Sequence, residues 1–446
     1  IGNQLRLHLG FGSLFHGDGV NSAALGAGRR PIPHLRVHFP SGVASCQTSS
    51  AEPGMSSSDT MIGVVGGGQL ARMLVQAASA RSIPIAVQTI SASDPAAEAA
   101  ARVVEADPRD VAGTRELVEG CEGITFENEW VNIDALIPLE QQGVRFRPSL
   151  ASLTPLVDKL SQRKLLDDLA IPSPPWCPLS LISPAQPSLP PGWNFPVMAK
   201  AARGGYDGKG TIVLKNIDAL AQLLRSVDSS DWLLETWVHY ERELALVVSR
   251  DSQGRLRSFP LVETHQHDQV CNWVLAPAGV DQDVESLAYN VAASLLTKLN
   301  YVGVLALEFF YGPAGLQVNE IAPRTHNSGH FSIEACTSSQ FDQQVCIAAG
   351  LPVPTPELRS DGALMVNLLG LNPTQAAPLE QRLTALREIP NAHLHWYGKS
   401  PETPGRKLGH ITVLLNASDA DHRDRQAKDV LTVVRGIWPE FPSVQD

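Results

Sequence analysis

Apolar residues recur along this chain with two periods, which show where strands and helices are expected. Short, nearly continuous runs of Val, Ile and Leu are typical of buried strands, whereas apolar residues three or four positions apart are typical of helices. From Met61 onward, MIGVV predicts a strand, QLARMLVQAASARS a helix and IPIAVQTI a second strand, with three glycines (66–68) turning the chain after the first. This order predicts a βαβ start and an α/β fold.

A hairpin is predicted near residue 314. YVGVLALEFFY and GLQVNEIAP both have the composition of strands, and the segment between them (312–315) is rich in turn residues. Glu308 and Glu320 are equally distant from Ala314, so a loop of odd length centred there would place the two carboxylates opposite each other. Facing carboxylates repel unless a cation lies between them, and such oxygen ligands suit Mg²⁺. The alternative is a solvated pair on an exposed sheet face.

A second segment indicates phosphate binding. FPVMAKAARGGYDGKGTIVLK predicts a strand, a glycine-rich loop (204–210) and another strand. The glycines leave backbone N–H groups uncovered, and Lys200 and Lys209 add positive charge. The Walker spacing would need glycine at Arg203 and a helix after the loop, so this is not a P-loop. We interpret it as a flap over a triphosphate, with an ordinary hairpin turn as the alternative.

The first glycine turn also invites a nicotinamide-cofactor interpretation, through Gly66-x-Gly68-x-x-Ala71. That interpretation is weak, because Thr89 stands near the end of the next strand where an acid would bind the ribose.

Composition narrows the class of protein. With 446 residues, 43% of them hydrophobic, the chain can form two or three cores, and its net charge of −11 argues against a general nucleic-acid or membrane-surface binder. No apolar run approaches the roughly 18 residues of a transmembrane helix. The six cysteines form no CxxC pair, which favours reduced thiols in a cytoplasmic enzyme.

Residues 1–60 differ from the rest. Ser, Gly, Pro, Arg and His are scattered there without an apolar period, so we expect a disordered extension, or translated sequence upstream of a start at Met55 or Met61. A transit peptide is a further alternative.

Proline-rich segments mark the later boundaries. The stretch 171–193 has eight prolines, so we expect no regular structure in it, and 351–360 is a second connector. The predicted parts are an N-terminal α/β domain (61–155), a central domain (156–350) with a flap subdomain (about 194–245), and a small β-rich C-terminal domain (351–446).

The order of motifs resembles a known family. A helix lysine (Lys159), a strand-end lysine (Lys200), GGYDGKG, LLETWV followed by Glu243, and the paired glutamates resemble the ATP-grasp superfamily. GGGQLARML, GGYDGKG, NEIAPRTHNSGH, HLHWYGK and PGRKLGH, in this order, are most similar to 5-(carboxyamino)imidazole ribonucleotide synthetases of purine biosynthesis. The similarity extends from about residue 61 to about residue 439 and is highly specific, because five motifs agree.

This resemblance implies a fold and an activity. The fold would be α/β (α+β overall): an ATP-grasp fold with an N-terminal Rossmann-like pre-grasp domain and a small C-terminal β-rich domain. The enzyme would use ATP, Mg²⁺ (or Mn²⁺) and bicarbonate, without biotin, to carboxylate 5-aminoimidazole ribonucleotide through carboxyphosphate. It would be a cytoplasmic homodimer that passes its product to a downstream mutase and binds neither nucleic acid nor membrane.

The resemblance also implies nucleotide-binding residues. Two lysines would hold phosphates, the segment 235–238 would bind adenine through backbone groups, and one acid, Glu243, would bind the ribose. The full predicted ATP-binding set is Lys159, Lys200, Gly205, Tyr206, Asp207, Gly208, Lys209, Gly210, Thr211, Glu235, Thr236, Trp237, Val238, Glu243, Gln266, Asn319 and Glu320. Gln266 stands where many relatives carry His. Mg²⁺ would be held by Glu308 and Glu320.

The remaining implied residues would bind the reacting groups. Arg324, His326 and Asn327 would hold bicarbonate and carboxyphosphate, a role that suits the planar fork of Arg. The predicted ribonucleotide-binding residues are Gly67, Gly68, Gln69, Glu127, Tyr206, Asp207, Lys209, Lys399 and Arg406, the last two at the 5′-phosphate. Glu127 could instead be a carboxylate at a helix N-terminus or a surface acid at a strand end. Lys407 is interpreted as a surface residue.

Two other classes remain open at this point. Another ATP-grasp ligase, such as a formate-dependent glycinamide ribonucleotide transformylase, is disfavoured by HLHWYGK and PGRKLGH. A non-catalytic adenine-nucleotide-binding protein would be expected to have lost a metal carboxylate or the Arg324 cluster, and both are present.

Overall fold

The computed structural model describes residues 60–204, 210–371, 377–399 and 401–440, all within the compact unit Met55–Asp446. The expectations for residues 1–59 lie outside the described residues. So do the predicted roles of Gly205, Tyr206, Asp207, Gly208 and Lys209.

The N-terminal sheet is parallel and has the strand order β3-β2-β1-β4. Its strands are β1 (Met61–Val65), β2 (Ile85–Thr89), β3 (Arg102–Glu105) and β4 (Cys121–Phe126). The helices of this region are α1 (Gln69–Ser79), α2 (Val111–Leu117), α3 (Ile133–Gln141) and α4 (Leu150–Leu153). The βαβ start predicted from the apolar pattern is confirmed, because α1 joins two parallel buried strands.

The flap region is a four-stranded antiparallel sheet with the order β5-β8-β6-β7. Its elements are β5 (Trp176–Pro178), β6 (Val197–Ala201), β7 (Thr211–Leu214), β8 (Trp232–Thr236) and α6 (Ile217–Ser226). The expectation that 171–193 contains no regular structure is wrong, since β5 pairs with β8 and a 3₁₀ turn follows at Leu179–Leu181. β5 is an edge strand, and an edge tolerates proline because one row of its N–H groups needs no partner.

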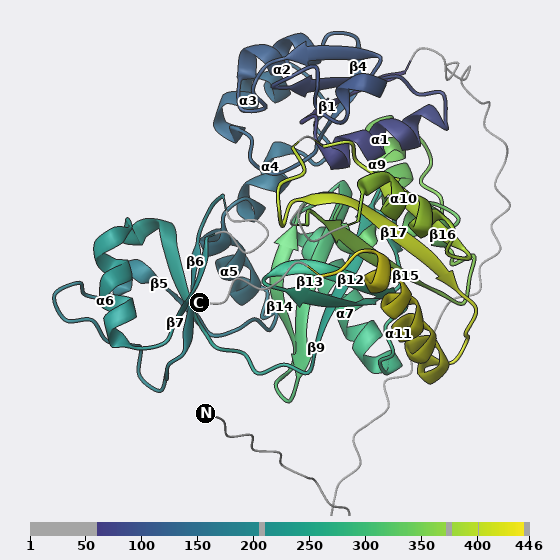
Figure 1. Ribbon diagram of the computed structural model, residues 1–446. Helices are drawn as coiled ribbons and strands as arrows, with labels where there is room; N and C mark the ends of the chain where they lie inside the picture. The colour runs from purple at the N-terminus through teal and green to yellow at the C-terminus, as the bar shows by residue number, and fades with distance from the viewer. Residues whose placement is uncertain (1–59, 205–209, 372–376, 400, 441–446) are drawn as a thin grey trace, which may run out of the picture. The chain divides into compact units, whose positions relative to one another are not determined.

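A nine-stranded sheet forms the largest element (Figure 1). Its order is β14-β13-β9-β11-β12-β15-β17-β16, with β10 paired to β9. The strands are β9 (Arg242–Arg250), β10 (Leu256–Ser258), β11 (Val262–His267), β12 (Val270–Ala276), β13 (Gly303–Gly312), β14 (Gly315–Ala322), β15 (Gly362–Leu369), β16 (Ala392–Trp396) and β17 (Lys407–Leu415). The three C-terminal strands continue this sheet through pairing of β15 with β12. The domain boundary at residue 351 stays a prediction.

Helices cover the large sheet. They are α5 (Lys159–Asp168), α7 (Gln282–Lys298), α8 (Ser332–Ala335), α9 (Gln340–Ala348), α10 (Leu379–Arg387) and α11 (Ala420–Ile437). Helix α7 packs its apolar side into a core with β9, β13 and β14, while α10 and α11 pack beside β15 to β17 (Figure 1).

The hairpin β13–β14 pairs Glu308 with Glu320, as predicted, but by a different route. Gly312 pairs with Gly315, so the loop has two residues, and the expected odd-length loop is wrong. The register shifts after Glu308, and Asn319 is the extra residue of a bulge in β14. Because of this extra residue, Glu320 rather than Asn319 pairs with Glu308, so the two carboxylates face each other.

Candidate active site

The paired glutamates lie on one face of the large sheet. Directly paired residues share a face, and so do residues two apart along a strand. Glu243 pairs with Phe310, which is two positions from Glu308, so Glu243 lies on the same face. Burial, the facing Glu320 and then Glu243 raise the pKa of Glu308. A second full negative charge is therefore unfavourable here unless a cation balances it.

Glu320 is balanced by a lysine. Lys159, the first residue of α5, places its Nζ 2.7 Å from Glu320 Oε1. Burial alone would raise the pKa of Glu320, but the charges of Lys159 and Lys200 hold it below its ordinary value. Glu320 is therefore the ionised member of the pair. A cation bound between the two carboxylates would favour ionisation of Glu308 as well.

A buried ion-pair cluster lies next to this pair. Lys200 Nζ is 2.7 Å from Glu235 Oε2 and donates to Asn319 Oδ1 at 3.0 Å. Arg163 Nε is 2.6 Å from Glu235 Oε1, and Arg163 Nη2 donates to the Asn319 carbonyl. Both carboxylate oxygens of Glu235 are thus engaged by side chains, and the backbone contact of its segment with adenine stays a prediction. Sequence reasoning missed Arg163; its position four residues after Lys159, on the same helix face, was the available signal.

The predicted ribose acid has two polar neighbours. Tyr240 donates its hydroxyl to Glu243 Oε1 at 2.5 Å, and the Gln266 side chain also hydrogen-bonds Glu243. Burial raises the pKa of Glu243, and these two hydrogen bonds oppose the rise. The fold thus brings Gln266 to this acid. Trp237, in the predicted adenine-binding segment, is 40% exposed.

The loop after β14 carries the predicted anion-binding residues. Arg324 Nε lies 2.8 Å from Glu129 Oε2, and His326 Nε2 lies 3.4 Å from Glu308 Oε1. Burial would lower the pKa of Arg324, but Glu129 and then Glu320 raise it. Glu129 was missed, although TFENEW contains two acids and only the first was singled out.

Asn327 is directed elsewhere. Its side-chain amide is buried and exchanges two hydrogen bonds with the Asn367 amide on β15, at 3.0 and 2.6 Å. These contacts do not bring its amide to the carboxylate pair. The predicted role of Asn327 in holding carboxyphosphate stays a prediction.

Several of the predicted ribonucleotide-binding residues meet around the start of α1. Lys399 Nζ donates to Gln69 Oε1, although 330 residues separate them. The Glu127 carboxylate accepts from the Gly68 N–H at 2.7 Å and the Leu70 N–H at 3.1 Å. Of the alternatives for Glu127, the helix N-terminal carboxylate is the one the geometry shows. A Cβ at Gly67 would collide with the Thr89 side chain, so the close packing of Thr89 against this turn requires glycine at position 67.

Arg406 and Lys407 differ from expectation. Arg406 is exposed, and its Nη1 donates to the Pro401 carbonyl at 3.0 Å, so no described contact brings it to Lys399. Lys407, interpreted from sequence as a surface residue, is partly buried at the start of β17, and its charge acts on Glu308 and His330.

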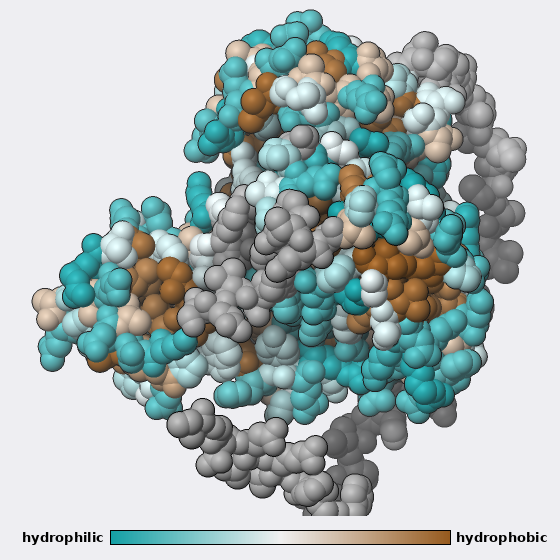
Figure 2. Space-filling view, in the orientation of Figure 1, coloured by the Kyte–Doolittle hydropathy of each residue, from teal (hydrophilic) through white to brown (hydrophobic). Residues whose placement is uncertain are grey.

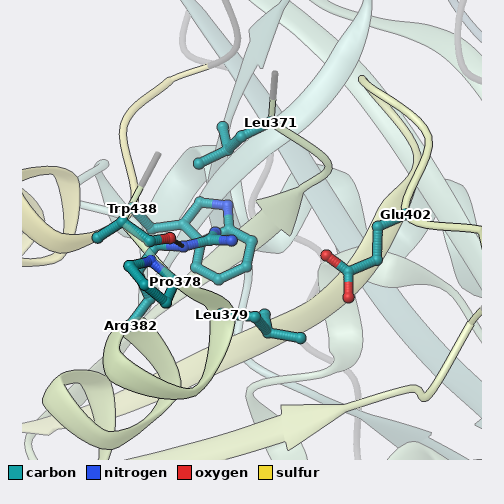
Figure 3. Close-up of a pocket in the computed structure, with 7 residues that line it drawn as sticks. Leu371, Pro378, Leu379, Arg382, Glu402 and Trp438 are labelled. Atoms are coloured by element: carbon teal, nitrogen blue, oxygen red, sulfur yellow. Dashed lines mark hydrogen bonds between the residues drawn. The ribbon is translucent and has the colours of Figure 1, made fainter. Parts of the chain in front are cut away.

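The described residues contain a cavity of about 340 Å³ away from this cluster. It is lined by Leu371, Ala377, Pro378, Leu379, Arg382, Glu402 and Trp438. Figure 3 shows the Arg382 guanidinium stacked on the Trp438 ring, 3.9 Å from the ring centroid, with Glu402 across the cavity. Apolar side chains gather on this side of the surface (Figure 2). None of the predicted site residues lines this cavity.

Two features are absent from the described residues. No group of three or more His, Cys, Asp or Glu side chains is arranged to hold a metal ion, so the Glu308–Glu320 pair would need further ligands such as phosphate oxygens. No helix in this part of the chain has both the length and the apolar character needed to span a bilayer.

Comparison with known families defines the class of protein first. Residues 59–155 match the ribonucleotide synthetase preATP-grasp domain, 164–341 the ATP-grasp domain, and 363–424 the phosphoribosylaminoimidazole carboxylase C-terminal domain. The fold class predicted from the motifs is therefore confirmed: an ATP-grasp fold behind a pre-grasp domain.

Individual relatives then narrow the class. The chain is 46% identical over 380 residues to N5-carboxyaminoimidazole ribonucleotide synthase of Synechococcus elongatus, covering 85% of this chain and 95% of the relative. It is 30% identical to carboxyaminoimidazole ribonucleotide synthase of Aspergillus clavatus solved with ATP, with a TM-score of 0.76 and coverages of 86% and 100%. For the Aspergillus clavatus complex with ADP and 5-aminoimidazole ribonucleotide, identity is 30%, the TM-score 0.75 and the coverages 85% and 100%. This chain belongs to the N5-carboxyaminoimidazole ribonucleotide synthase family.

Replacing Gly204 with Val is expected to weaken ATP binding about tenfold. Gly204 leads into the flap with φ of +73°, a region that costs a side chain roughly 1–2 kcal/mol. Gly120→Val is the matched control, since Gly120 also has positive φ and open space around it but lies in the turn before β4. Calorimetric titration with ATP should separate the two variants; equal affinities would make residue 204 part of an ordinary turn.

Proposed function

We propose that this chain carboxylates 5-aminoimidazole ribonucleotide at the expense of ATP and bicarbonate, giving N5-carboxyaminoimidazole ribonucleotide, ADP and phosphate in purine biosynthesis. The observation that carries the proposal is the opposed Glu308–Glu320 pair with Lys159 at 2.7 Å and His326 at 3.4 Å, in a chain of this family. Anionic reactants need such a grouping of metal ligands and cations, because the chain as a whole is acidic.

The reaction has two steps. A bicarbonate oxygen attacks the γ-phosphorus of ATP, the bond to the β,γ-bridging oxygen breaks, and carboxyphosphate and ADP form. The exocyclic amine of the ribonucleotide then attacks the carboxyl carbon, the carbon–oxygen bond to phosphate breaks, and the nitrogen loses a proton. The protein contributes positioning and charge stabilisation.

The residues fit Mg²⁺ by the chemistry of the donor set. Glu308 and Glu320 supply two hard oxygen ligands on one face of the sheet. The raised pKa of Glu308 shows that its ionised form is disfavoured here, and a bound cation would stabilise that form. When held there, Mg²⁺ would neutralise charge on the phosphate oxygens during transfer; Mn²⁺ has similar ligand preferences. A carboxyl group carried as carboxyphosphate needs no biotin.

Specific side chains would hold the reactants. Lys159 and Lys200 would bind nucleotide phosphates, and Glu243 the ribose hydroxyls, since each carboxylate oxygen can accept from one hydroxyl. Arg324 would grip bicarbonate, kept in place by its ion pair with Glu129. Lys399 and Gln69 would meet the ribonucleotide beside α1. A homodimer, a cytoplasmic location and transfer of the product to a mutase stay predictions.

The test is ADP release measured with each reactant omitted in turn. We expect release to require ATP, bicarbonate and 5-aminoimidazole ribonucleotide together. Release that instead requires formate and glycinamide ribonucleotide would assign a different ATP-grasp reaction. ATP binding without release under any combination would indicate a nucleotide-binding protein.

A further inference from the structure

One buried tyrosine anchors the C-terminal segment to the N-terminal sheet. Tyr397 directly follows β16 and is 2% exposed. It packs in a core cluster whose other buried members come mostly from the N-terminal sheet, α1 and α9, including Val87, Leu74 and Phe341. Within the described part of that cluster, Tyr397 is the one member beyond residue 349.

The same tyrosine borders the loop that carries Lys399. Its N–H donates to the Leu408 carbonyl at 2.9 Å, and its carbonyl accepts from Arg72 Nη1 on α1 at 3.4 Å. Lys399 Nζ lies 5.4 Å from the Tyr397 ring centroid and reaches Gln69, also on α1. The position of the Lys399 ammonium therefore depends on where the Tyr397 ring and backbone are held.

The Tyr397 hydroxyl is fixed by a histidine. It hydrogen-bonds His410 Nδ1 on β17 at 2.7 Å. Burial lowers the pKa of His410 well below its ordinary range, so the ring is held in its neutral form. His410 stacks on His395, with 4.4 Å between ring centroids, and His395 in turn bonds Glu334 at 2.6 Å.

Two further buried side chains, His330 and Gln340, connect His410 to His326. The His410 and His330 ring centroids are 4.9 Å apart, and Gln340 Nε2 donates to His330 Nδ1 at 3.2 Å. Gln340 also holds the backbone of His326 at both ends: its Nε2 donates to the His326 carbonyl at 2.7 Å, and its Oε1 accepts from the His326 N–H at 2.8 Å. His326 is the residue beside Glu308.

We propose that Tyr397 is a positioning residue: its hydroxyl, held by His410, sets the loop that presents Lys399 to the ribonucleotide, and the chain His410–His330–Gln340 ties that loop to His326. Low polarity around the network strengthens each of its hydrogen bonds. The inference rests on the proposed function, because it assumes that Lys399 binds the ribonucleotide.

Tyr397→Phe tests this inference, because it removes the hydroxyl and keeps the ring. We expect the KM for 5-aminoimidazole ribonucleotide to rise about fivefold to tenfold, with the KM for ATP and kcat changed less than about twofold. The matched control is Tyr301→Phe: Tyr301 is also fully buried and donates its hydroxyl to the Val304 carbonyl at 3.0 Å. It should lose similar thermal stability and leave both KM values unchanged.

A second variant removes the histidine partner of this hydrogen bond. His410→Phe keeps an aromatic ring at that position, and we expect the same selective rise in the KM for the ribonucleotide. Native-like KM values in Tyr397→Phe, or equal shifts in Tyr397→Phe and Tyr301→Phe, would reduce the network to a structural role. Failure of the proposed function appears separately, as unmodified protein that releases no ADP in response to the ribonucleotide; in that case the inference falls with it.

Discussion

Glu308→Gln is expected to abolish carboxylation while leaving the folded protein at least as stable as before. The substitution removes a metal ligand, and loss of a preorganised charge-stabilising group typically costs roughly 10²–10³-fold in rate. It also removes a negative charge that burial and the facing Glu320 disfavour, so Tm without nucleotide and metal should stay level or rise. Glu320→Gln should be equally inactive but less stable, since it breaks the contact with Lys159.

Initial rates across a Mg²⁺ titration, together with thermal unfolding of the metal-free protein, check this prediction. Glu263→Gln is the control, since Glu263 is a partly buried acid on β11, two strands from β13 in the same sheet, and is ion-paired with Arg242 at 3.0 Å. It should leave the Mg²⁺ dependence unchanged. Near-normal turnover of Glu308→Gln at limiting Mg²⁺ would remove that residue from the metal site.

Lys399→Ala should raise the KM for 5-aminoimidazole ribonucleotide at least about tenfold and leave the KM for ATP nearly unchanged. A charge-assisted hydrogen bond contributes roughly 1.5–3 kcal/mol, and 1.4 kcal/mol corresponds to a factor of ten. The contact of Lys399 with Gln69 places its charge at the start of α1, beside the three glycines at 66–68.

Steady-state kinetics with each substrate varied separately measure the effect. Lys298→Ala, at the exposed C-terminal end of α7, loses the same charge away from the site and should change neither constant. A lower affinity of Lys399→Ala for ATP, with an unchanged affinity for the ribonucleotide, would show that the C-terminal loop binds ATP and not the ribonucleotide.

Local sequence patterns predicted the elements whose cause is local. The apolar run at 61–65 and the turn glycines after it specify β1 and α1, and two strand-like runs around a turn specify the hairpin that opposes Glu308 and Glu320. The bulge at Asn319 was not predictable from spacing, because a two-residue loop and a bulge produce the same pairing as a longer loop.

Contacts between distant segments were beyond sequence reasoning. Arg324 meets Glu129 across 195 positions, and Arg163 meets Glu235 across 72, so neither partner is visible until the chain folds. Asn327 is a related case: it stands in a run of polar residues that suggested anion binding, and no sequence signal indicated that its amide pairs with Asn367. Proximity in sequence to a functional residue does not fix the direction of a side chain.

The pairing of β15 with β12 makes the C-terminal residues part of the catalytic domain's own sheet. Trp273, Val274, Leu275 and Ala276 each lie opposite a residue of β15, and most of them are buried. A chain that stopped before Gly362 would leave this row of N–H and C=O groups open, and an unpaired apolar edge recruits strands from other molecules. The C-terminal segment thus protects the nucleotide-binding half from aggregation, apart from any residues it lends to the substrate.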